Sequence, residues 1–196
     1  MSEIAVIVLA AGLGTRMKSD LPKVLHRAAG RSLLGHVLQA ARTLGSTRTV
    51  VVAGPGMDGV SAEALRIIPD AAIAIQADRK GTGHAVSMAR QALAGFTGTV
   101  LVLYGDVPLI QVEPLEQLCR LVSGGNGMAV LGFDAADPTG YGRLLRNAAG
   151  NVVAIREHLD STPEERRITL CNSGIISISS TMLWDMIPKI GNANAK

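Results

Sequence analysis

Short apolar runs alternate with segments of helical periodicity through the first two thirds of the chain. Runs such as AVIVLA and TVLVLY are continuously apolar, which is typical of strands that are covered on both faces. The pattern predicts strands at 4–10, 49–53, 72–75 and 99–104 and helices near 32–44, 59–66, 82–94 and 112–122. Strands and helices in this order indicate a mostly parallel sheet with helices on both faces.

The last third of the chain has a different pattern. Residues 127–133 are expected to form another strand, and PTGYGRLLRNAAGNVVAIREH is expected to form two extended segments about a turn at 149–151. The segment LCNSGIISIS predicts a further strand, which precedes a helix in STMLWDMIPKI. We therefore expect one α/β domain over 1–196 with a β-rich insertion in its second part.

Composition and charge exclude several classes of protein. Hydrophobic residues make up 47% of the chain but aromatic residues only 3%, so a nucleic-acid partner with base-stacking platforms is not expected, and the net charge is only +3. Cys119 and Cys171 show no zinc or disulfide spacing. No signal peptide is evident and no apolar run approaches about 18 residues, so we expect a cytoplasmic protein without a membrane partner.

The first predicted strand runs directly into a glycine-rich, basic loop, LAAGLGTRMKSDLPK. Gly12 and Gly14 allow backbone amides to close on an anion, while Arg16, Lys18 and Lys23 add positive charge. The third glycine of a dinucleotide fingerprint is missing, the second predicted strand lacks the acidic end that binds ribose, and no Walker loop is present. The loop therefore predicts a phosphate site that serves neither NAD nor ordinary ATPase chemistry.

Polar residues follow the third predicted parallel strand at the same expected sheet edge. Gln76 offers a donor and an acceptor that complement a pyrimidine, and the Gly81–Gly83 segment permits close approach of the backbone. The alternatives are that Gln76 is a solvated loop residue and that Thr82 merely caps a helix.

An acidic residue follows the fourth predicted strand. Asp106, next to Tyr104 and Gly105, can bind Mg²⁺ that is also held by phosphate oxygens. The alternative is an aspartate that only forms a turn before Val107 and Pro108. Because the basic loop and this acid are expected at one edge of the sheet, the two features support each other.

Several polar residues of the second part could bind the hydroxyl and amide groups of a sugar, or could serve only turns and surface solvation. These residues are Tyr141, Gly142, Arg143, Glu157 and Asn172–Gly174. The four histidines, His26, His36, His84 and His158, show no metal spacing and are expected to be ordinary helix or loop residues.

A series of motifs covers nearly the whole chain in order: LAAGLGTRMKSDLPKVLH, QADRKGTGHA, LYGDVPL, PTGYGR, REH and NSGI. The series closely resembles the bacterial N-acetylglucosamine-1-phosphate uridyltransferases, the N-terminal domain of a bifunctional enzyme that also acetylates glucosamine 1-phosphate. The resemblance implies a Rossmann-like nucleotide-diphospho-sugar transferase fold. It also implies that UTP and N-acetylglucosamine 1-phosphate react to give UDP-N-acetylglucosamine and pyrophosphate, a precursor supply for peptidoglycan and lipopolysaccharide.

The resemblance also implies roles for individual residues. Uridine and phosphate contacts would come from Leu9, Ala10, Ala11 and Gly12, with Arg16 and Lys23 as the catalytic cations on the phosphates. Uracil and its neighbourhood would be held by Gln76, Gly81 and Thr82, and the reaction centre would be bordered by Tyr104, Gly105 and Asp106, with Asp106 on Mg²⁺. The N-acetylglucosamine moiety would be contacted by Gly142, Glu157 and Asn172.

Two features of the family lie after the point where this sequence stops. Its members have a further Asn ligand for the same Mg²⁺, and then a left-handed β-helix acetyltransferase domain. We therefore expect a uridyltransferase domain that lacks its C-terminal end, from a full-length parent that forms a homotrimer. Another nucleotide or sugar phosphate, or a sugar-nucleotide-binding domain without activity, are the alternatives.

Overall fold

The computed structural model describes residues 3–14, 17–78 and 80–191. Its contacts divide the chain into two compact units. The first contains the chain up to Ala129 together with Ile176–Ile190, and the second contains Val130–Ile175. The expectation of one domain over 1–196 stays a prediction.

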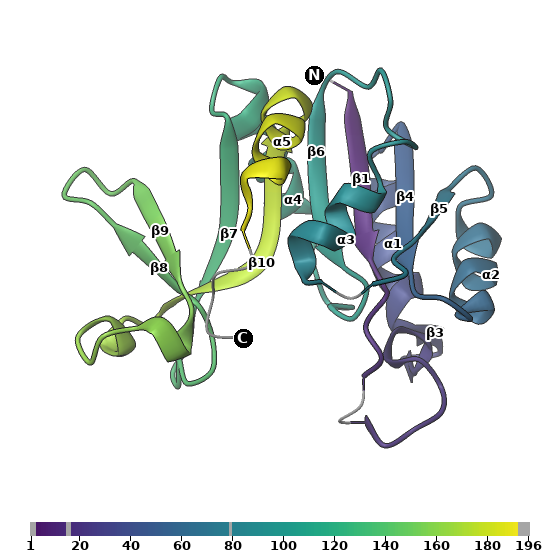
Figure 1. Cartoon of the computed structure of the whole chain (residues 1–196), viewed down its shortest axis with the longest axis horizontal. Helices are drawn as coiled ribbons and strands as arrows, with labels where there is room; N and C mark the ends of the chain where they lie inside the picture. Colours follow the sequence, from purple (N-terminus) through teal and green to yellow (C-terminus); the bar gives the residue numbers. More distant parts are fainter. Residues whose placement is uncertain (1–2, 15–16, 79, 192–196) are drawn as a thin grey trace. The chain divides into compact units, whose positions relative to one another are not determined.

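The first unit is built on a parallel sheet (Figure 1). Its parallel strands are, in spatial order, β5 (Ala72–Ile75), β4 (Arg48–Ala53), β1 (Ile4–Leu9) and β6 (Thr99–Tyr104). The last part of β10 (Leu170–Ser179) pairs with β6 in the antiparallel direction. The predicted parallel core is therefore confirmed.

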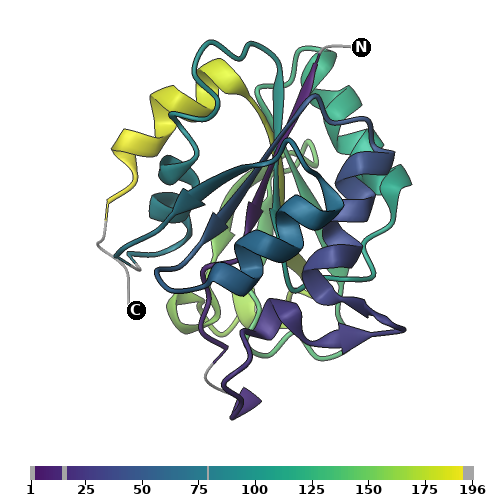
Figure 2. The same ribbon diagram turned by 90° about the vertical axis from the view of Figure 1, so that its right-hand side faces the viewer.

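Helices cover both faces of this sheet (Figure 2). One face carries α3 (Thr82–Met88) and α5 (Ser180–Met186), and the other carries α1 (Leu33–Thr43), α2 (Asp58–Ile67) and α4 (Val112–Ser123). Successive residues of a strand point to opposite faces, and the neighbours Ile7 and Val8 are both fully buried. Burial on both faces explains why the strands are continuously apolar.

The helix predicted at 82–94 is wrong in its length, since α3 ends at Met88. The chain continues in turns, in which the amide of Arg90 donates to the carbonyl of Ser87 at 3.1 Å and Gly95 has a φ of +70°. Leu93 is nevertheless buried, so the apolar spacing persists where the helix does not. The other strands and helices predicted before 134 agree with the structure to within one residue at either end.

The second unit is rich in strands, as expected. It contains most of β7 (Met128–Asp134), the antiparallel pair β8 (Arg143–Arg146) and β9 (Val152–Arg156), and the first part of β10, with which β7 and β8 pair. The predicted turn is present, because the side-chain oxygen of Asn147 accepts from the amides of Ala149 and Asn151. Two short 3-10 helices follow β9, namely η3 (His158–Asp160) and η4 (Glu165–Arg167).

The segment between the glycine loop and α1 forms elements that the sequence pattern did not indicate. These are the 3-10 helix η2 (Lys23–Leu25) and a short hairpin of β2 (Arg27–Ala28) and β3 (Arg31–Ser32).

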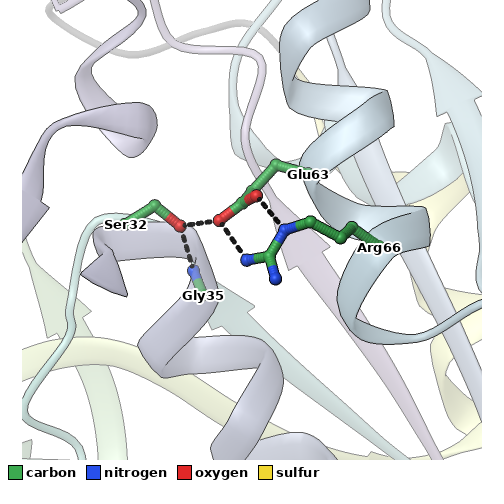
Figure 3. Close-up of polar contacts among 4 residues, drawn as sticks. All are labelled: Ser32, Gly35, Glu63 and Arg66. Atoms are coloured by element: carbon green, nitrogen blue, oxygen red, sulfur yellow. Dashed lines mark hydrogen bonds and ion pairs between the residues drawn. The ribbon is translucent and has the colours of Figure 1, made fainter. Parts of the chain in front are cut away.

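A polar cluster fixes the end of that segment (Figure 3). Ser32 caps α1, because its Oγ accepts from the amide of Gly35 at 2.9 Å, and the same hydroxyl donates to Oε1 of Glu63 at 2.5 Å. Arg66 donates to both oxygens of Glu63, at 2.8 and 3.0 Å. The hydrogen bonds from Arg66 are the main reason that the pKa of Glu63 lies below its ordinary value. The start of α1 is thereby tied to α2.

In the part of the chain that the structure describes, we find no helix with the length and apolar character needed to cross a membrane.

Candidate active site

A cavity of about 380 Å³ lies in the first unit, where the parallel strands β1, β5 and β6 end. Its walls come from the loop after β1, from the first residues of α3 and from the segments that follow β5 and β6. The lining residues are Leu9, Ala10, Ala11, Gly12, Gly14, Lys23, Val24, Gln76, Gly81, Thr82, Ala85, Tyr104 and Asp106.

Backbone hydrogen bonds continue the sheet beyond the strand ends and bring these segments together. The amide of Ala10 donates to the carbonyl of Val52 at 2.8 Å, and the amide of Gln76 donates to that of Ala53 at 2.8 Å. The amide of Gly105 donates to the carbonyl of Leu9 at 2.9 Å. The segments that follow the carboxyl ends of β1, β5 and β6 therefore meet at one edge of the sheet, where ligands of such sheets bind.

Lys23 and Asp106 form an ion pair in this cavity. The distance between Lys23 Nζ and Asp106 Oδ2 is 2.7 Å, and their side chains are 40% and 30% exposed. Gly14 permits this arrangement, because its φ is +62° and a Cβ at this position would lie 2.6 Å from the Cβ of Lys23. The pair joins the glycine loop to the end of β6 while both charged groups stay accessible from solvent.

The chemistry of Asp106 fits a magnesium ligand. Mg²⁺ is commonly held by one or two carboxylates together with phosphate oxygens and water. Asp106 supplies one carboxylate, its contact with Lys23 uses only Oδ2, and it lines the cavity. The described residues contain no group of three or more His, Cys, Asp or Glu side chains that could hold a metal ion without other ligands, at this cavity or elsewhere.

Gln76 is buried, with 4% of its surface exposed, so the interpretation of this residue as a solvated loop residue is wrong. Its Nε2 lies 3.2 Å from the carbonyl oxygen of Gly81 and 3.2 Å from Nδ1 of His84. Gly81 has a φ of +96° and occupies the cap position of α3, which begins at Thr82. The alternative in which Thr82 caps the helix is therefore also wrong.

The cavity gathers most of the residues that sequence reasoning assigned to a nucleotide. Gly105 lies directly between two lining residues, whereas Arg16 lies outside the described residues. Sequence reasoning missed Val24 and Ala85 as parts of the wall. Ala85 lies one helical turn after Thr82 on α3, and that spacing was a signal that could have identified it.

The three residues expected to contact a sugar come together in the second unit. The amide of Asn172 donates to the carbonyl of Gly142 at 2.8 Å. A Cβ on Gly142 would lie 3.4 Å from Oε1 of Glu157, so the carboxylate is adjacent to this backbone. Asn172 also serves a turn, since its Oδ1 accepts from the amide of Gly174 at 2.9 Å.

Arg143 lies beside this cluster and is buried, with 1% of its surface exposed. Its guanidinium donates to the carbonyl oxygens of Tyr141 and Arg166, and its Nη2 lies 3.3 Å from Nδ1 of His158. Among the described side chains, no carboxylate forms an ion pair with it and its Nε has no partner. Arg143 therefore links the segments that carry Gly142 and Glu157, instead of presenting its charge to solvent.

Comparison with known proteins places the chain in a family. Residues 6–167 match the family model described as a MobA-like NTP transferase domain. The chain is 53% identical over 198 residues to the bifunctional protein GlmU of Azorhizobium caulinodans, covering 100% of this chain and 44% of that protein. It is 50% identical over 193 residues to the bifunctional protein GlmU of Xanthobacter autotrophicus, covering 98% and 43%. The chain thus spans less than half the length of these curated relatives.

Solved structures share the fold at low sequence identity. A putative glucose-1-phosphate thymidylyltransferase from Bacillus anthracis, in complex with a sucrose, superposes with a TM-score of 0.78 at 18% identity, over 96% of this chain and 76% of that chain. A UDP-glucose pyrophosphorylase complexed with UDP-glucose gives 0.75 at 18% identity, over 99% and 83%. The resemblance inferred from the motifs is confirmed: the chain belongs to the MobA-like NTP transferase domain family and is homologous to a region of the bacterial bifunctional GlmU proteins.

Proposed function

We propose that this chain transfers UMP from UTP to N-acetylglucosamine 1-phosphate, giving UDP-N-acetylglucosamine and pyrophosphate. The observation that carries the proposal is the 2.7 Å pair of Lys23 Nζ and Asp106 Oδ2 in the cavity beside the glycine loop. A cation for phosphate and a carboxylate for a divalent metal meet at one point there. The homology to bifunctional GlmU proteins over the whole chain supports the choice of reaction.

The proposed reaction is an in-line displacement, in which the phosphate oxygen of the sugar attacks the α-phosphorus and pyrophosphate leaves. A phosphate dianion is already nucleophilic, so the chain needs to supply alignment and charge neutralisation but no general base. Amides of the glycine loop would orient the phosphates, Lys23 would neutralise the α-phosphate, and Arg16 would hold the departing pyrophosphate. Asp106 would hold Mg²⁺, which when bound offsets the negative charge of the phosphates.

The cluster of the second unit is proposed to bind the acceptor. Glu157 and Asn172 offer acceptors and a donor for sugar hydroxyl and amide groups. Their closeness to the backbone of Gly142 supports a shared role. A cytoplasmic location, assembly of the full-length parent as a homotrimer, acetylation by that parent, and supply of cell-wall precursors are proposals that follow from the family.

Pyrophosphate release measured with Mg²⁺ tests the proposal. UTP, CTP, GTP and dTTP are each combined with N-acetylglucosamine 1-phosphate or glucose 1-phosphate, and we expect turnover to be fastest with UTP and the acetylated sugar. A preference for another pair would assign a related nucleotidyltransferase. Binding of UDP-N-acetylglucosamine without turnover at saturating Mg²⁺ would assign a binding domain. Arg16→Ala and Lys23→Ala are expected to lower turnover far more than uridine binding.

A further inference from the structure

We propose that His84 is a positioning residue that sets the base specificity of the cavity through Gln76. The inference deepens the proposed function and rests on it, because it states how the cavity distinguishes the base of one nucleoside triphosphate from another. The geometry favours a base that carries a ring N–H, such as uracil, over a base that presents a ring nitrogen lone pair in the same place, such as cytosine.

The contact with Gly81 fixes the orientation of the Gln76 carboxamide. A backbone carbonyl oxygen can only accept a hydrogen bond. The atom of Gln76 that lies 3.2 Å from the carbonyl oxygen of Gly81 is therefore its NH₂ group. The φ of +96° at Gly81 belongs to a conformation that other residues rarely adopt, so the backbone conformation that places this carbonyl favours glycine.

The contact with Gln76 also fixes the tautomer of His84. The same Nε2 of Gln76 lies 3.2 Å from Nδ1 of His84. An amide nitrogen carries two hydrogens and accepts none, so Nδ1 must accept and the imidazole hydrogen must be on Nε2 of His84. Both hydrogens of the Gln76 amide are then used inside the protein.

The carboxamide oxygen of Gln76 is left for a ligand. Within the described residues this oxygen has no protein partner. The buried side-chain atoms without a partner in that part of the chain are His26 Nε2 and Arg143 Nε, so the oxygen of Gln76 is not fully buried. Gln76 lines the cavity, so the atom it offers to a ligand is an acceptor. An acceptor pairs with the N3–H of uracil or thymine and opposes the N3 lone pair of cytosine.

His84 adds a second constraint on this orientation, beside the contact with Gly81. Without an acceptor at Nδ1, one amide hydrogen of Gln76 loses its partner, and only the contact with Gly81 still fixes the carboxamide. The carboxamide could then serve a lone pair as well as an N–H, at the cost of its contact with Gly81. A site built to recognise one hydrogen-bonding pattern would become tolerant of the other.

Two substitutions of His84 separate positioning from packing. His84→Phe keeps a ring but removes the acceptor, whereas His84→Asn retains an acceptor oxygen on a shorter side chain. The matched control is His36→Phe, since the ring of His36 also makes one polar contact, to the carbonyl of Ala28 at 2.8 Å, but does not line the cavity. For each variant, kcat and KM are measured with UTP and CTP, and the affinities for UDP and CDP are measured by calorimetry.

We expect His84→Phe to lower the preference for UTP over CTP by about tenfold or more, through KM and product affinity, while kcat with UTP changes by less than about threefold. His84→Asn should restore most of the preference, and His36→Phe should leave it unchanged. A wild-type preference for UTP that survives in His84→Phe would overturn the role of His84 and leave the proposed function intact. If the wild-type protein does not use UTP, the proposed function itself fails.

A measurement on the wild-type chain keeps the inference testable if His84→Phe does not fold. Long-range ¹H–¹⁵N NMR spectra of the imidazole groups distinguish the two neutral tautomers. We expect the neutral imidazole of His84 to carry its hydrogen on Nε2. A hydrogen on Nδ1 would be incompatible with the contact to Gln76 as described and would overturn the inference.

Discussion

Two carboxylates of the first unit, Asp106 and Glu63, each contact a cation but differ in how many of their hydrogen-bond acceptor sites are used by the protein. Glu63 accepts hydrogen bonds on both oxygens, from Ser32 and from Arg66 (Figure 3). Asp106 contacts Lys23 through Oδ2 alone and lines the cavity. Glu63 therefore has little capacity left for a ligand, whereas Asp106 keeps most of its own.

This difference indicates what each group contributes. A carboxylate whose acceptor sites are filled by the protein stabilises the fold, and here it fixes the start of α1 to α2. A carboxylate that is held by one cation at the edge of a cavity can exchange that partner for a metal ion, which also binds phosphate oxygens, and the released cation can then pair with a phosphate. We expect substitutions at Asp106 to change activity more than stability, and substitutions at Glu63 to do the reverse.

The largest effect is expected for Asp106→Asn. The amide removes the negative charge that would hold Mg²⁺ and that pairs with Lys23, so turnover should fall by about 100-fold or more. The free energy of unfolding should change by less than about 1 kcal/mol, because the pair is partly exposed. Pyrophosphate release and urea unfolding measure the two quantities.

The control for that variant is Asp185→Asn. Asp185 pairs with Lys189 at 2.9 Å, and both side chains are more than half exposed. It does not line the cavity, so turnover should stay at the wild-type level. Equal activity of Asp106→Asn and Asp185→Asn would contradict the role proposed for Asp106.

A smaller but still large loss of turnover is expected for Gly14→Ala. The new Cβ would lie 2.6 Å from the Cβ of Lys23, and alanine would have to adopt the φ of +62° that Gly14 has. Lys23 or the loop must therefore shift away from Asp106. Turnover should fall by about tenfold or more. Gly56→Ala is the control, because Gly56 has a similar φ of +71° but open space around it. If both variants lose equal activity, backbone strain and not the displacement of Lys23 is responsible.

Glu157 of the second unit extends the comparison to a third carboxylate. Glu157→Gln keeps the shape of the side chain but removes its charge, so hydrogen bonds that it accepts from sugar hydroxyl groups should weaken. We expect the KM for N-acetylglucosamine 1-phosphate to rise by about tenfold while the KM for UTP stays the same. Glu164→Gln, at an exposed acid nearby in the chain, serves as control. A change in the KM for UTP alone would contradict the proposed contact between Glu157 and the acceptor sugar.

The sequence predicted the part of this fold that repeats. Continuous apolar runs identified the strands because both faces of the sheet are buried. Residues that follow parallel strands lie at one edge of the sheet, so Lys23 and Asp106 could be expected together although 83 residues separate them. No comparable rule joins Ser32 to Glu63, because a polar contact between two helices leaves no periodic signal. The sequence left three roles open for Arg143, namely a sugar contact, a turn or surface solvation. Burial of its guanidinium against the backbone carbonyl oxygen of Arg166 was not among them, because arginine is usually exposed.

The smallest effect is expected for Glu63→Gln, and it concerns stability. The variant weakens the hydrogen bonds with Ser32 and Arg66, which should lower the free energy of unfolding at neutral pH by about 1 kcal/mol and leave turnover unchanged. Because the pKa of Glu63 in the folded protein lies below its ordinary value of 4.5, the folded state binds fewer protons than the unfolded state near that pH. The stabilisation is therefore complete above 4.5 and is lost as the pH falls through the lowered pKa.

Urea unfolding of the wild-type protein and Glu63→Gln, followed from neutral pH downward, measures this loss. The difference in stability between the two proteins should shrink as the medium becomes acidic, since glutamine does not titrate and wild-type Glu63 becomes protonated. Glu116→Gln is the control, because Glu116 contacts Arg120 only at 3.7 Å on an exposed helix surface and should show little effect at any pH. A loss of turnover in Glu63→Gln without a loss of stability would reverse the comparison with Asp106, and would mean that the tie between α1 and α2 acts on the cavity and not on the fold.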